Sequence, residues 1–428
     1  MNLLPLGAML VLLALNVPVA LAIAMATLVF FLQGAGPPVD IFIQRFVAST
    51  DSFPLLAVPL FILAGTIMNY AGIARRLLAL AEALVGHWTG GLAQANIVFA
   101  ALMGGPSASA NADAAMQTKM VGGEMTRRGY PPAFTAALVA CASVIAPIIP
   151  PGIGLIVYAF LADVSVGRIF IGGILPGLLL TVALMAAAAF VARRRGYRPE
   201  RARFVGGAEL WRVFKEALWS LTIPIFILVG IRYGIFTPTE AGAITVVYTV
   251  LVGMFAYRTL RLADLPRILR ETSLDTASVM LMICAASAFG FYLAWERLPP
   301  KMAEWLVTLT SDPTALLLLL NAMLIVLGTA IEGTSALIIL TPILIPVIVK
   351  LGIDPVHFGI VLVANLTIAG VTPPVGQMMF ISSQVLKVPM NKYSVEVMPF
   401  LGAMMGVLLL LTLFPQLSTW LPNLMYGK

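Results

Sequence analysis

The residues best suited to bind a ligand lie at four short breaks inside apolar stretches. Two breaks carry short polar side chains and glycines that offer oxygen atoms or backbone amides: Ser107, Ser109, Asn111, Gly333, Thr334 and Ser335. The other two are rich in proline and glycine, and they contain Pro147, Pro150, Gly370, Thr372 and Gly376. A proline break frees backbone carbonyls, which suit a hard cation such as Na⁺, whereas the N-terminus of a half-helix suits an anion.

Carboxylates inside apolar stretches are the second group of candidates, because charge within a bilayer is rare and usually functional. Asp113 follows the first break, where it could act as a gating or site acid or could stabilise a helix N-terminus. Glu332 lies in the second break, either as a gating or cation-site acid or as a partner of neighbouring amides. Glu240 differs, because Thr237 precedes it at the spacing of a capping box. Asp275 lies near the end of an apolar span and is expected to reach the interface.

These breaks interrupt a chain that is too apolar to be soluble. Of its 428 residues, 60% are hydrophobic and 11% are charged, and its mean hydropathy is +1.00. Soluble domains carry about 25% charged residues. The composition excludes a soluble enzyme, a disordered chain and a nucleic-acid-binding domain, and it predicts an all-α polytopic protein embedded in the lipid bilayer. The sequence contains no HExxH motif and no GxxxxGK[ST] motif, so we expect neither metal chemistry nor ATP hydrolysis.

Nine stretches are long enough to cross a bilayer, for which a helix needs about 20 apolar residues. They are 4–32, 53–70, 132–162, 165–192, 216–232, 237–256, 271–293, 356–386 and 394–421. Two more, at about 92–123 and about 313–349, are broken near the middle and predict re-entrant hairpins, because neither half could cross alone. The stretches at about 132–162 and about 356–386 predict interrupted helices, and in the second Thr372 is expected to cap a helix that restarts at Pro373.

The placement of Lys and Arg predicts the orientation of the chain. If both hairpins enter and leave on one side, 19 of the 26 basic residues fall in loops on a single side, and the basic loop 193–215 is one of them. Cytoplasmic loops collect such residues, so this side is predicted to be cytoplasmic. The N-terminus is then expected in the cytoplasm and the C-terminus in the periplasm.

Matched markers indicate an internal duplication. Pro150 and Pro373 are 223 residues apart, and Ser109 and Ser335 are 226 residues apart. Inverted repeats with paired interrupted helices are typical of secondary transporters, whose substrate sites lie near the middle of the membrane. The predicted units are a first repeat over 1–215, a linking span over 216–232 and a second, inverted repeat over 233–428.

Five motifs, in this order, resemble the large membrane subunit, of the DctM type, of a tripartite ATP-independent periplasmic (TRAP) transporter. They are GPSASANAD at 105–113, PIIPP at 147–151, GIFTPTEA at 234–241, LTPILIP at 340–346 and TPPVG at 372–376. The resemblance covers essentially the whole chain. It implies an elevator-type ion transporter in the bacterial inner membrane that imports organic acids, such as C4-dicarboxylates or sugar acids, together with Na⁺. One departure is Glu332, where many relatives have Asp.

The resemblance also implies roles for the residues at the breaks. Na⁺ is expected at Ser107, Pro147, Pro150, Gly333, Gly370, Thr372 and Gly376. The substrate is expected at Ser109, Asn111, Thr334 and Ser335, with Asp113 and Glu332 as candidate gating or site acids. The implied partners are a small four-span membrane subunit of the DctQ type and a periplasmic substrate-binding protein of the DctP type.

Other functions remain open at this point. A stand-alone carboxylate or oxyanion transporter with a related hairpin fold would need neither partner. An intramembrane hydrolase could use Ser107 or Ser109 as its nucleophile, but no histidine lies at a suitable membrane depth to activate it. A passive channel would need rings of charge or a filter, which the breaks do not present. A transporter rather than an enzyme is therefore the expected function.

Overall fold

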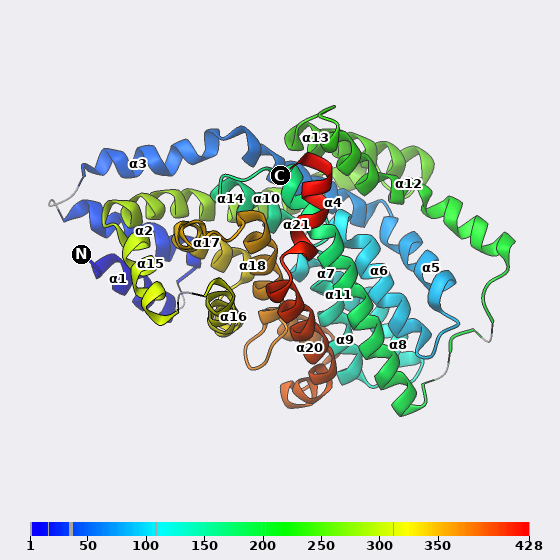
Figure 1. Ribbon diagram of the computed structural model, residues 1–428. Helices are drawn as coiled ribbons and strands as arrows, with labels where there is room; N and C mark the ends of the chain where they lie inside the picture. The colour runs from blue at the N-terminus through cyan, green and yellow to red at the C-terminus, as the bar shows by residue number, and fades with distance from the viewer. Residues whose placement is uncertain are drawn as a thin grey trace.

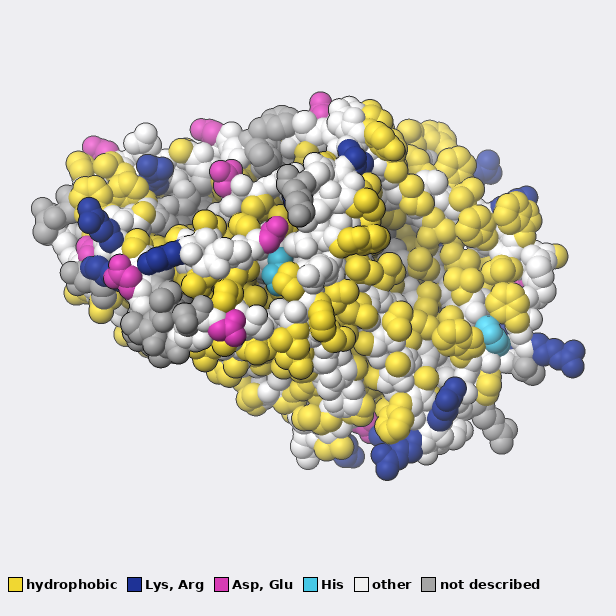
Figure 2. Space-filling model, viewed as in Figure 1, with side chains coloured by type: hydrophobic (Ala, Val, Ile, Leu, Met, Phe, Trp, Pro, Cys, Tyr) yellow, Lys and Arg dark blue, Asp and Glu magenta, His cyan; other side chains and the backbone are white. Residues whose placement is uncertain are grey.

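The computed structural model describes residues 2–427, apart from Asn16, 34–36, Ala108, Arg198, Ala202 and Ser311. All regular secondary structure in these described residues is helical, and among them seven helices are long and apolar enough to cross a membrane. Figure 2 shows apolar side chains over most of the visible face, with Lys and Arg mainly toward its margins. The predicted all-α membrane architecture is confirmed.

The first predicted hairpin is present. Its first arm is α6 (Gly91–Ser107), and its second arm is α7 (Ala110–Gln117), which continues through a π-helical turn (Thr118–Gly122) into α8 (Gly123–Arg127). The chain can reverse here because Ser109 adopts an extended conformation and caps α7, with its hydroxyl accepting a hydrogen bond from the Ala112 amide at 3.5 Å.

The second hairpin is formed by α16 (Pro313–Ala330) and α17 (Gly333–Lys350). Each arm has 18 residues and is among the seven helices long enough to cross a membrane, so the expectation that neither half could cross alone is wrong for this hairpin. Buried amides attach it to its neighbours, because Asn365 donates a hydrogen bond to the Asn321 side chain at 3.0 Å, and Asn321 donates one to Thr412 at 2.7 Å. All three side chains are buried, where an unpaired amide would be costly. The network therefore holds the first arm of this hairpin in one position.

The helix after each hairpin is interrupted, as expected. The first is divided into α9 (Pro132–Ser143) and α10 (Ile153–Leu161), and the second into α18 (Pro355–Ala369) and α19 (Gln377–Leu386). Both gaps contain a cis X-Pro bond, at Pro150-Pro151 and at Pro373-Pro374. The two interrupted helices also cross closely, since a Cβ atom at Gly359 would collide with the ring of Tyr158.

Further helices pack beside this assembly, with α5 and α12 on the right in Figure 1. They are α4 (Ala57–Tyr70), which bends by 69° into α5 (Ile73–Val85), α11 (Val166–Arg195), α12 (Gly207–Arg232), α13 (Pro238–Leu251) and α14 (Leu265–Trp295). Helix α13 packs along α4, α14 packs against α4, and α12 packs against α5. The expected capping box at the start of α13 is confirmed: the Glu240 carboxylate accepts from the Thr237 amide at 2.7 Å, and the Glu240 amide donates to the Thr237 hydroxyl at 3.3 Å.

The single first span expected at 4–32 is wrong. This segment forms two helices, α1 (Leu4–Ala14) and α2 (Val19–Leu32), which pack against each other as a hairpin (Figure 1). Asn2 lies at the C-terminal end of α14, where its carbonyl accepts a hydrogen bond from Tyr292 at 2.7 Å, and the ring of Phe30 at the end of α2 is also 5.0 Å from that of Tyr292. Both ends of the segment therefore lie at the same end of α14. Pro18 is the residue directly before α2, at its N-cap position.

The last expected span, 394–421, is also divided. Helix α20 (Met390–Leu413) ends just before Pro415, and a short helix, α21 (Gln416–Tyr426), follows and packs against α11 and α18. Helix α12 begins nine residues earlier than the predicted start at 216, because its charged first turns continue beyond the apolar core. Two amphipathic helices, α3 (Val39–Ala48) and α15 (Leu298–Leu309), complete the fold.

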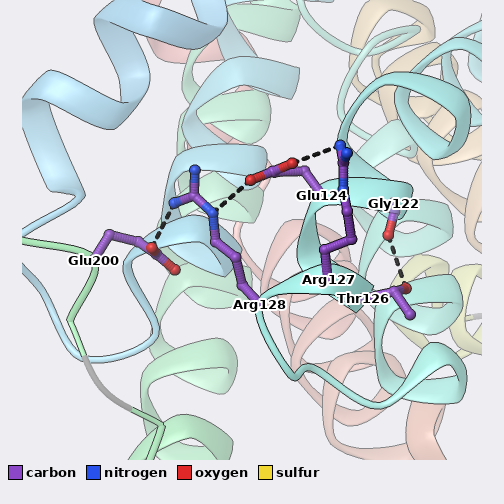
Figure 3. A network of polar contacts seen from close by, with 6 residues as sticks. All are labelled: Gly122, Glu124, Thr126, Arg127, Arg128 and Glu200. Atoms are coloured by element: carbon purple, nitrogen blue, oxygen red, sulfur yellow. Dashed lines mark hydrogen bonds and ion pairs between the residues drawn. The ribbon is translucent and has the colours of Figure 1, made fainter.

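A group of ion pairs lies where the first hairpin ends (Figure 3). Glu124 on α8 contacts both Arg127, at 2.6 Å, and Arg128, at 2.8 Å, and Arg128 also contacts Glu200 in the segment between α11 and α12. In the same segment, the Glu200 amide donates a hydrogen bond to the Gly86 carbonyl at 3.0 Å. The end of the hairpin and the α11–α12 connection are thus held together.

Candidate functional site

A cavity of about 950 Å³ lies where the hairpin tips and the helix breaks meet α2, α4 and α14. Most of the predicted site residues line it: Ser109, Asn111, Pro147, Glu332, Gly333, Thr334, Ser335 and Gly370. Residues from both repeats therefore form one site. The fold brings together positions that are more than 200 residues apart in the sequence.

Four helices begin at this cavity. Their first residues, which all line it, are Ala110 of α7, Ile153 of α10, Gly333 of α17 and Gln377 of α19. The first amides of a helix have no partner within the helix, and the helix dipole places partial positive charge there. Four N-termini directed at one cavity provide an environment for an anion.

The two repeats are joined directly at the first hairpin tip. Asn111, in the first turn of α7, donates a hydrogen bond from Nδ2 to Oε1 of Gln377, the first residue of α19, at 2.9 Å. Both side chains line the cavity. Ser107 is the last residue of α6, but its side chain lies outside the part of the chain that the structure describes.

At the second tip, Glu332 is the N-cap of α17. Its carboxylate accepts hydrogen bonds from the amide of Ser335 at 2.7 Å and from the hydroxyl of Ser335 at 2.9 Å. Of the two roles considered for Glu332, the structure therefore shows the hydrogen bond with a neighbouring amide. Thr334, by contrast, is half-buried at the cavity wall.

The break residues divide into two groups. Pro147 and Gly370 line the cavity, whereas Pro150, Thr372 and Gly376 do not. The expectation that Thr372 caps a helix beginning at Pro373 is wrong, because that helix begins at Gln377 after Gly376. The Thr372 hydroxyl instead donates to the Ile368 carbonyl at 2.9 Å, and the Thr372 carbonyl accepts from the Gly376 amide at 3.2 Å.

Asp113 follows the first tip in the chain but is not among the residues that line the cavity. It is fully buried in the first turn of α7, and its carboxylate accepts a hydrogen bond from Gln117 at 2.7 Å. An acid in the first turn of a helix interacts favourably with the helix dipole. This position fits the structural role that the sequence left open for Asp113.

Several lining residues were missed by the sequence reasoning. Gln377 could have been found from its place directly after the glycine that ends the break. Glu271 and Asp275, one turn apart on α14, both line the cavity. Asn69 on α4 and Pro18 before α2 line the cavity as well, although no motif marks them.

The charged side chains that line the described cavity all carry negative charge. Among the described residues that line the cavity, the charged ones are Glu271, Asp275 and Glu332, and none is Lys, Arg or His. An anion in this cavity would meet favourable helix N-termini but no basic lining side chain. Asp275 and Glu332 would oppose it, whereas Glu271 pairs with Arg267 at 3.1 Å. A cation that enters with the anion would offset these negative charges.

The chain matches the family model described as "Tripartite ATP-independent periplasmic transporter, DctM component" over residues 6–417. It is 38% identical to the sialic acid TRAP transporter large permease protein SiaM of Vibrio cholerae over 414 residues, which are 96% of each chain. It is 33% identical to the C4-dicarboxylate TRAP transporter large permease protein DctM of Rhodobacter capsulatus, covering 98% of each chain. It is also 38% identical to the isethionate TRAP transporter permease protein DctMQ of Oleidesulfovibrio alaskensis, covering 95% of this chain and 64% of that longer one.

A solved structure has the same fold. The crystal structure of the YdaH transporter of Alcanivorax borkumensis, described as having an unusual topology, matches with a TM-score of 0.64. The match covers 87% of this chain and 86% of the other, at 16% sequence identity. At this identity the likeness concerns the fold alone.

Proposed function

This chain belongs to the family of DctM components, the large permease subunits of TRAP transporters, and we propose that it imports organic acids together with Na⁺ by an elevator movement. It is a multi-pass membrane protein. We place it in the bacterial inner membrane, where it works with a small four-span subunit and with a periplasmic protein that delivers the substrate.

The observation that carries this proposal is the composition of the cavity. Four helix N-termini favour a carboxylate, but three acidic side chains and no basic one line the same space in the described structure. A carboxylate that enters alone adds negative charge to a site that already carries it. Binding of Na⁺ beside the substrate offsets this charge, so the two solutes favour each other's binding.

We assign the Na⁺ sites to the hairpin tips and the breaks that face them. The assigned residues are Ser107, Pro147, Pro150, Gly333, Gly370, Thr372 and Gly376. The substrate contacts are assigned to Ser109, Asn111, Thr334 and Ser335. Support comes from the cavity lining, in which Pro147, Gly333 and Gly370 lie beside the four helix N-termini.

We retain the orientation indicated by the basic residues, with one change. Residues 1–33 contain no Lys or Arg, so the charge rule does not place them. Asn2 contacts Tyr292 and Glu296 at the C-terminal end of α14, which this orientation puts outside. We therefore place Asn2 on the periplasmic side, in place of the cytoplasmic side expected from the sequence.

The test is uptake into proteoliposomes that contain this subunit, its small partner and the binding protein. An inward Na⁺ gradient should drive uptake of the acid that the binding protein binds, and collapse of that gradient should stop it. Uptake that ignores Na⁺ and follows a pH gradient would refute the coupling. Uptake that persists without the binding protein and the small subunit would favour the stand-alone transporter.

A matched pair of variants links this assay to the site. Replacement of Ser109 by Leu places a bulky side chain at the N-terminus of α7 and should abolish Na⁺-dependent uptake. Replacement of Ser273 by Ala changes an exposed hydroxyl on α14 that bonds only the Leu269 carbonyl among the described residues, and it should leave uptake unchanged. Equal uptake by Ser109→Leu and the unmodified protein would contradict the assigned substrate site.

A further inference from the structure

A second hollow, of about 560 Å³, lies on α11 and shares no lining residue with the cavity at the hairpin tips. Its lining consists of Ala186, Ala189, Phe190, Arg193 and Arg194. Residues at these spacings lie on one face of a helix. From Ala186 to Arg194 the helix rises about 12 Å, so an apolar stripe (Ala186, Ala189 and Phe190) leads to two arginines in the last turn of α11.

The opposite face of α11 packs into the protein, where Ala188 and Ala192 are fully buried. On the apolar stripe, by contrast, Ala186 is exposed and the Phe190 side chain is 60% exposed. Helix α11 is apolar and long enough to span a membrane. An exposed phenylalanine on such a helix meets hydrocarbon rather than water, so lipid chains lie against the apolar stripe.

The two arginines of the hollow differ from their neighbour in how their charge is compensated. Arg195 pairs with Glu396 on α20 at 2.8 Å, whereas Arg193 and Arg194 form no ion pair with any residue that the structure describes. Both are exposed, and the Arg194 guanidinium lies 5.9 Å from the centre of the Phe190 ring. Two positive charges without a carboxylate partner therefore stand at one end of the apolar stripe.

We propose that this hollow binds a phospholipid whose headgroup carries net negative charge. Arg193 and Arg194 hold the phosphate, because a planar guanidinium presents paired donors to phosphate oxygens, and an acyl chain lies along the apolar stripe. In the orientation retained above, the basic loop 193–215 puts this end of α11 at the cytoplasmic leaflet. A free phosphate would occupy the arginines alone and leave the stripe uncovered, so a lipid fits the whole lining.

Native mass spectrometry of the purified, delipidated subunit measures this binding, because each bound lipid adds its mass. The probes are dioleoyl-phosphatidylglycerol, which is anionic, and dioleoyl-phosphatidylcholine, which has the same chains and no net charge. The first phosphatidylglycerol should bind about ten- to thirtyfold more tightly, since each arginine beside an anionic lipid contributes about fivefold in affinity. Equal affinities for the two lipids would overturn the proposal. Displacement of the lipid by an equal concentration of glycerol 3-phosphate would also overturn it, in favour of a site for free anions.

A pair of double variants tests the arginines. Arg193→Gln with Arg194→Gln should bring the affinity for phosphatidylglycerol to within about threefold of that for phosphatidylcholine, whereas Lys at both positions keeps the charge and should retain the preference. The control, Arg203→Gln with Arg212→Gln, removes the same charge from exposed positions of the loop 193–215 that do not line the hollow. It should leave the preference unchanged. An equal loss in the control would show general attraction of charge and would overturn the site.

The apolar stripe is tested separately. Ala186→Trp places a large ring at an exposed position of the stripe and keeps both arginines, so it should weaken the first binding event of both lipids. Unchanged affinity in this variant would overturn the placement of the acyl chain. Thermal unfolding verifies that each variant is folded. If the double Gln variant does not fold, Arg193→Gln and Arg194→Gln are measured singly, and each should lose about fivefold in affinity for phosphatidylglycerol. A loss below twofold in both would overturn the proposal.

Discussion

Asn111 donates a hydrogen bond to Gln377 at 2.9 Å, and this bond connects the first hairpin with the second interrupted helix. Each residue lies in the first turn of a helix that begins at the cavity. The bond is thus a direct polar contact between the N-termini of α7 and α19. The two repeats contribute to the site as a coupled pair rather than as independent halves.

The contribution of this bond can be measured with a double-mutant cycle. A neutral hydrogen bond contributes about 0.5–1.5 kcal/mol, so Asn111→Ala and Gln377→Ala should each reduce uptake by about two- to tenfold. The double variant should lose less than the product of the two single losses, because the bond is lost only once. Gln44→Ala, at an exposed position on α3, is the control and should transport normally. Strictly multiplicative losses would show that the two residues act separately.

Glu332 should be replaceable by a shorter acid. Asp is one of the best N-cap residues, so Glu332→Asp should keep α17 capped and retain most of the uptake activity. Glu332→Ala removes the acceptor of both Ser335 hydrogen bonds and should lower the unfolding free energy by about 1–2 kcal/mol. Thermal unfolding of the purified variants checks the cap, and uptake checks the activity. An Asp variant that is stable but inactive would instead assign Glu332 a role in cation binding or gating.

The capping box at the start of α13 makes a prediction about stability alone. Thr237→Ala removes the hydroxyl that accepts a hydrogen bond from the Glu240 amide, so the unfolding free energy should fall by about 1 kcal/mol. Thr237→Ser keeps the acceptor and is the matched control. Neither variant should change the Na⁺ dependence of uptake, because this cap does not line the cavity. A change in Na⁺ dependence would show that the start of α13 participates in transport.

The stabilisation from the ion pairs at the end of the first hairpin should not change with pH near neutrality. Hydrogen bonding to Arg128 lowers the pKa of Glu124 below its ordinary value of 4.5. A carboxyl with a lowered pKa stabilises the fold above its unfolded pKa, and that stabilisation is lost as the pH falls through the lower folded value. Thermal stability should therefore be flat between about pH 6 and pH 8 and should decline only below about pH 4.5.

Single neutralisations in this region should be tolerated because exposed ion pairs contribute little. Glu200→Gln removes one partner of Arg128, and uptake should change by less than about twofold. The same holds for Arg201→Gln, whose partner Glu209 is equally exposed. A severe loss in either variant would show that the α11–α12 connection controls transport rather than only anchoring the topology.

The hairpins and interrupted helices could be predicted from sequence because their signals are local. Prolines and glycines that cluster within a few residues end a helix here, and the predicted breaks coincide with the gaps before α10 and α19, whereas single prolines such as Pro176 and Pro399 lie inside helices. The capping box at Thr237 was equally predictable, since both partners lie within four residues. Such features depend on the chemistry of a few neighbouring residues.

The hairpin of α1 and α2 could not be predicted in this way. A uniformly apolar run has the same hydropathy whether it crosses the membrane once or turns back, and Pro18 alone does not distinguish a kink from a reversal. The reversal depends on packing against the distant end of α14, where Phe30 meets Tyr292. The charged start of α12 was missed because a helix can continue beyond the bilayer.

The tips and breaks that line the cavity were predicted from sequence, but the lining residues on α4 and α14 were not. The tips and breaks carry motifs, whereas Glu271, Asp275 and Asn69 lie on helices whose sequence does not reveal which face meets the cavity. Asp113 and Thr372 have the right residue types for a site, but one lies behind the tip and the other bonds within its own turn. Residue type therefore identified the region, and only the packing distinguished lining residues from supporting ones.

The lack of basic side chains in the described cavity lining has a consequence for the energetics of the cell. A carrier that held its acid with an arginine could bind and release the acid without sodium, and the accumulated acid would leak back down its gradient. In this chain the acidic side chains of the described lining disfavour binding of the acid without a cation. If transport is coupled to Na⁺ as proposed, the lack of basic side chains in the described lining would limit backward leak of the acid.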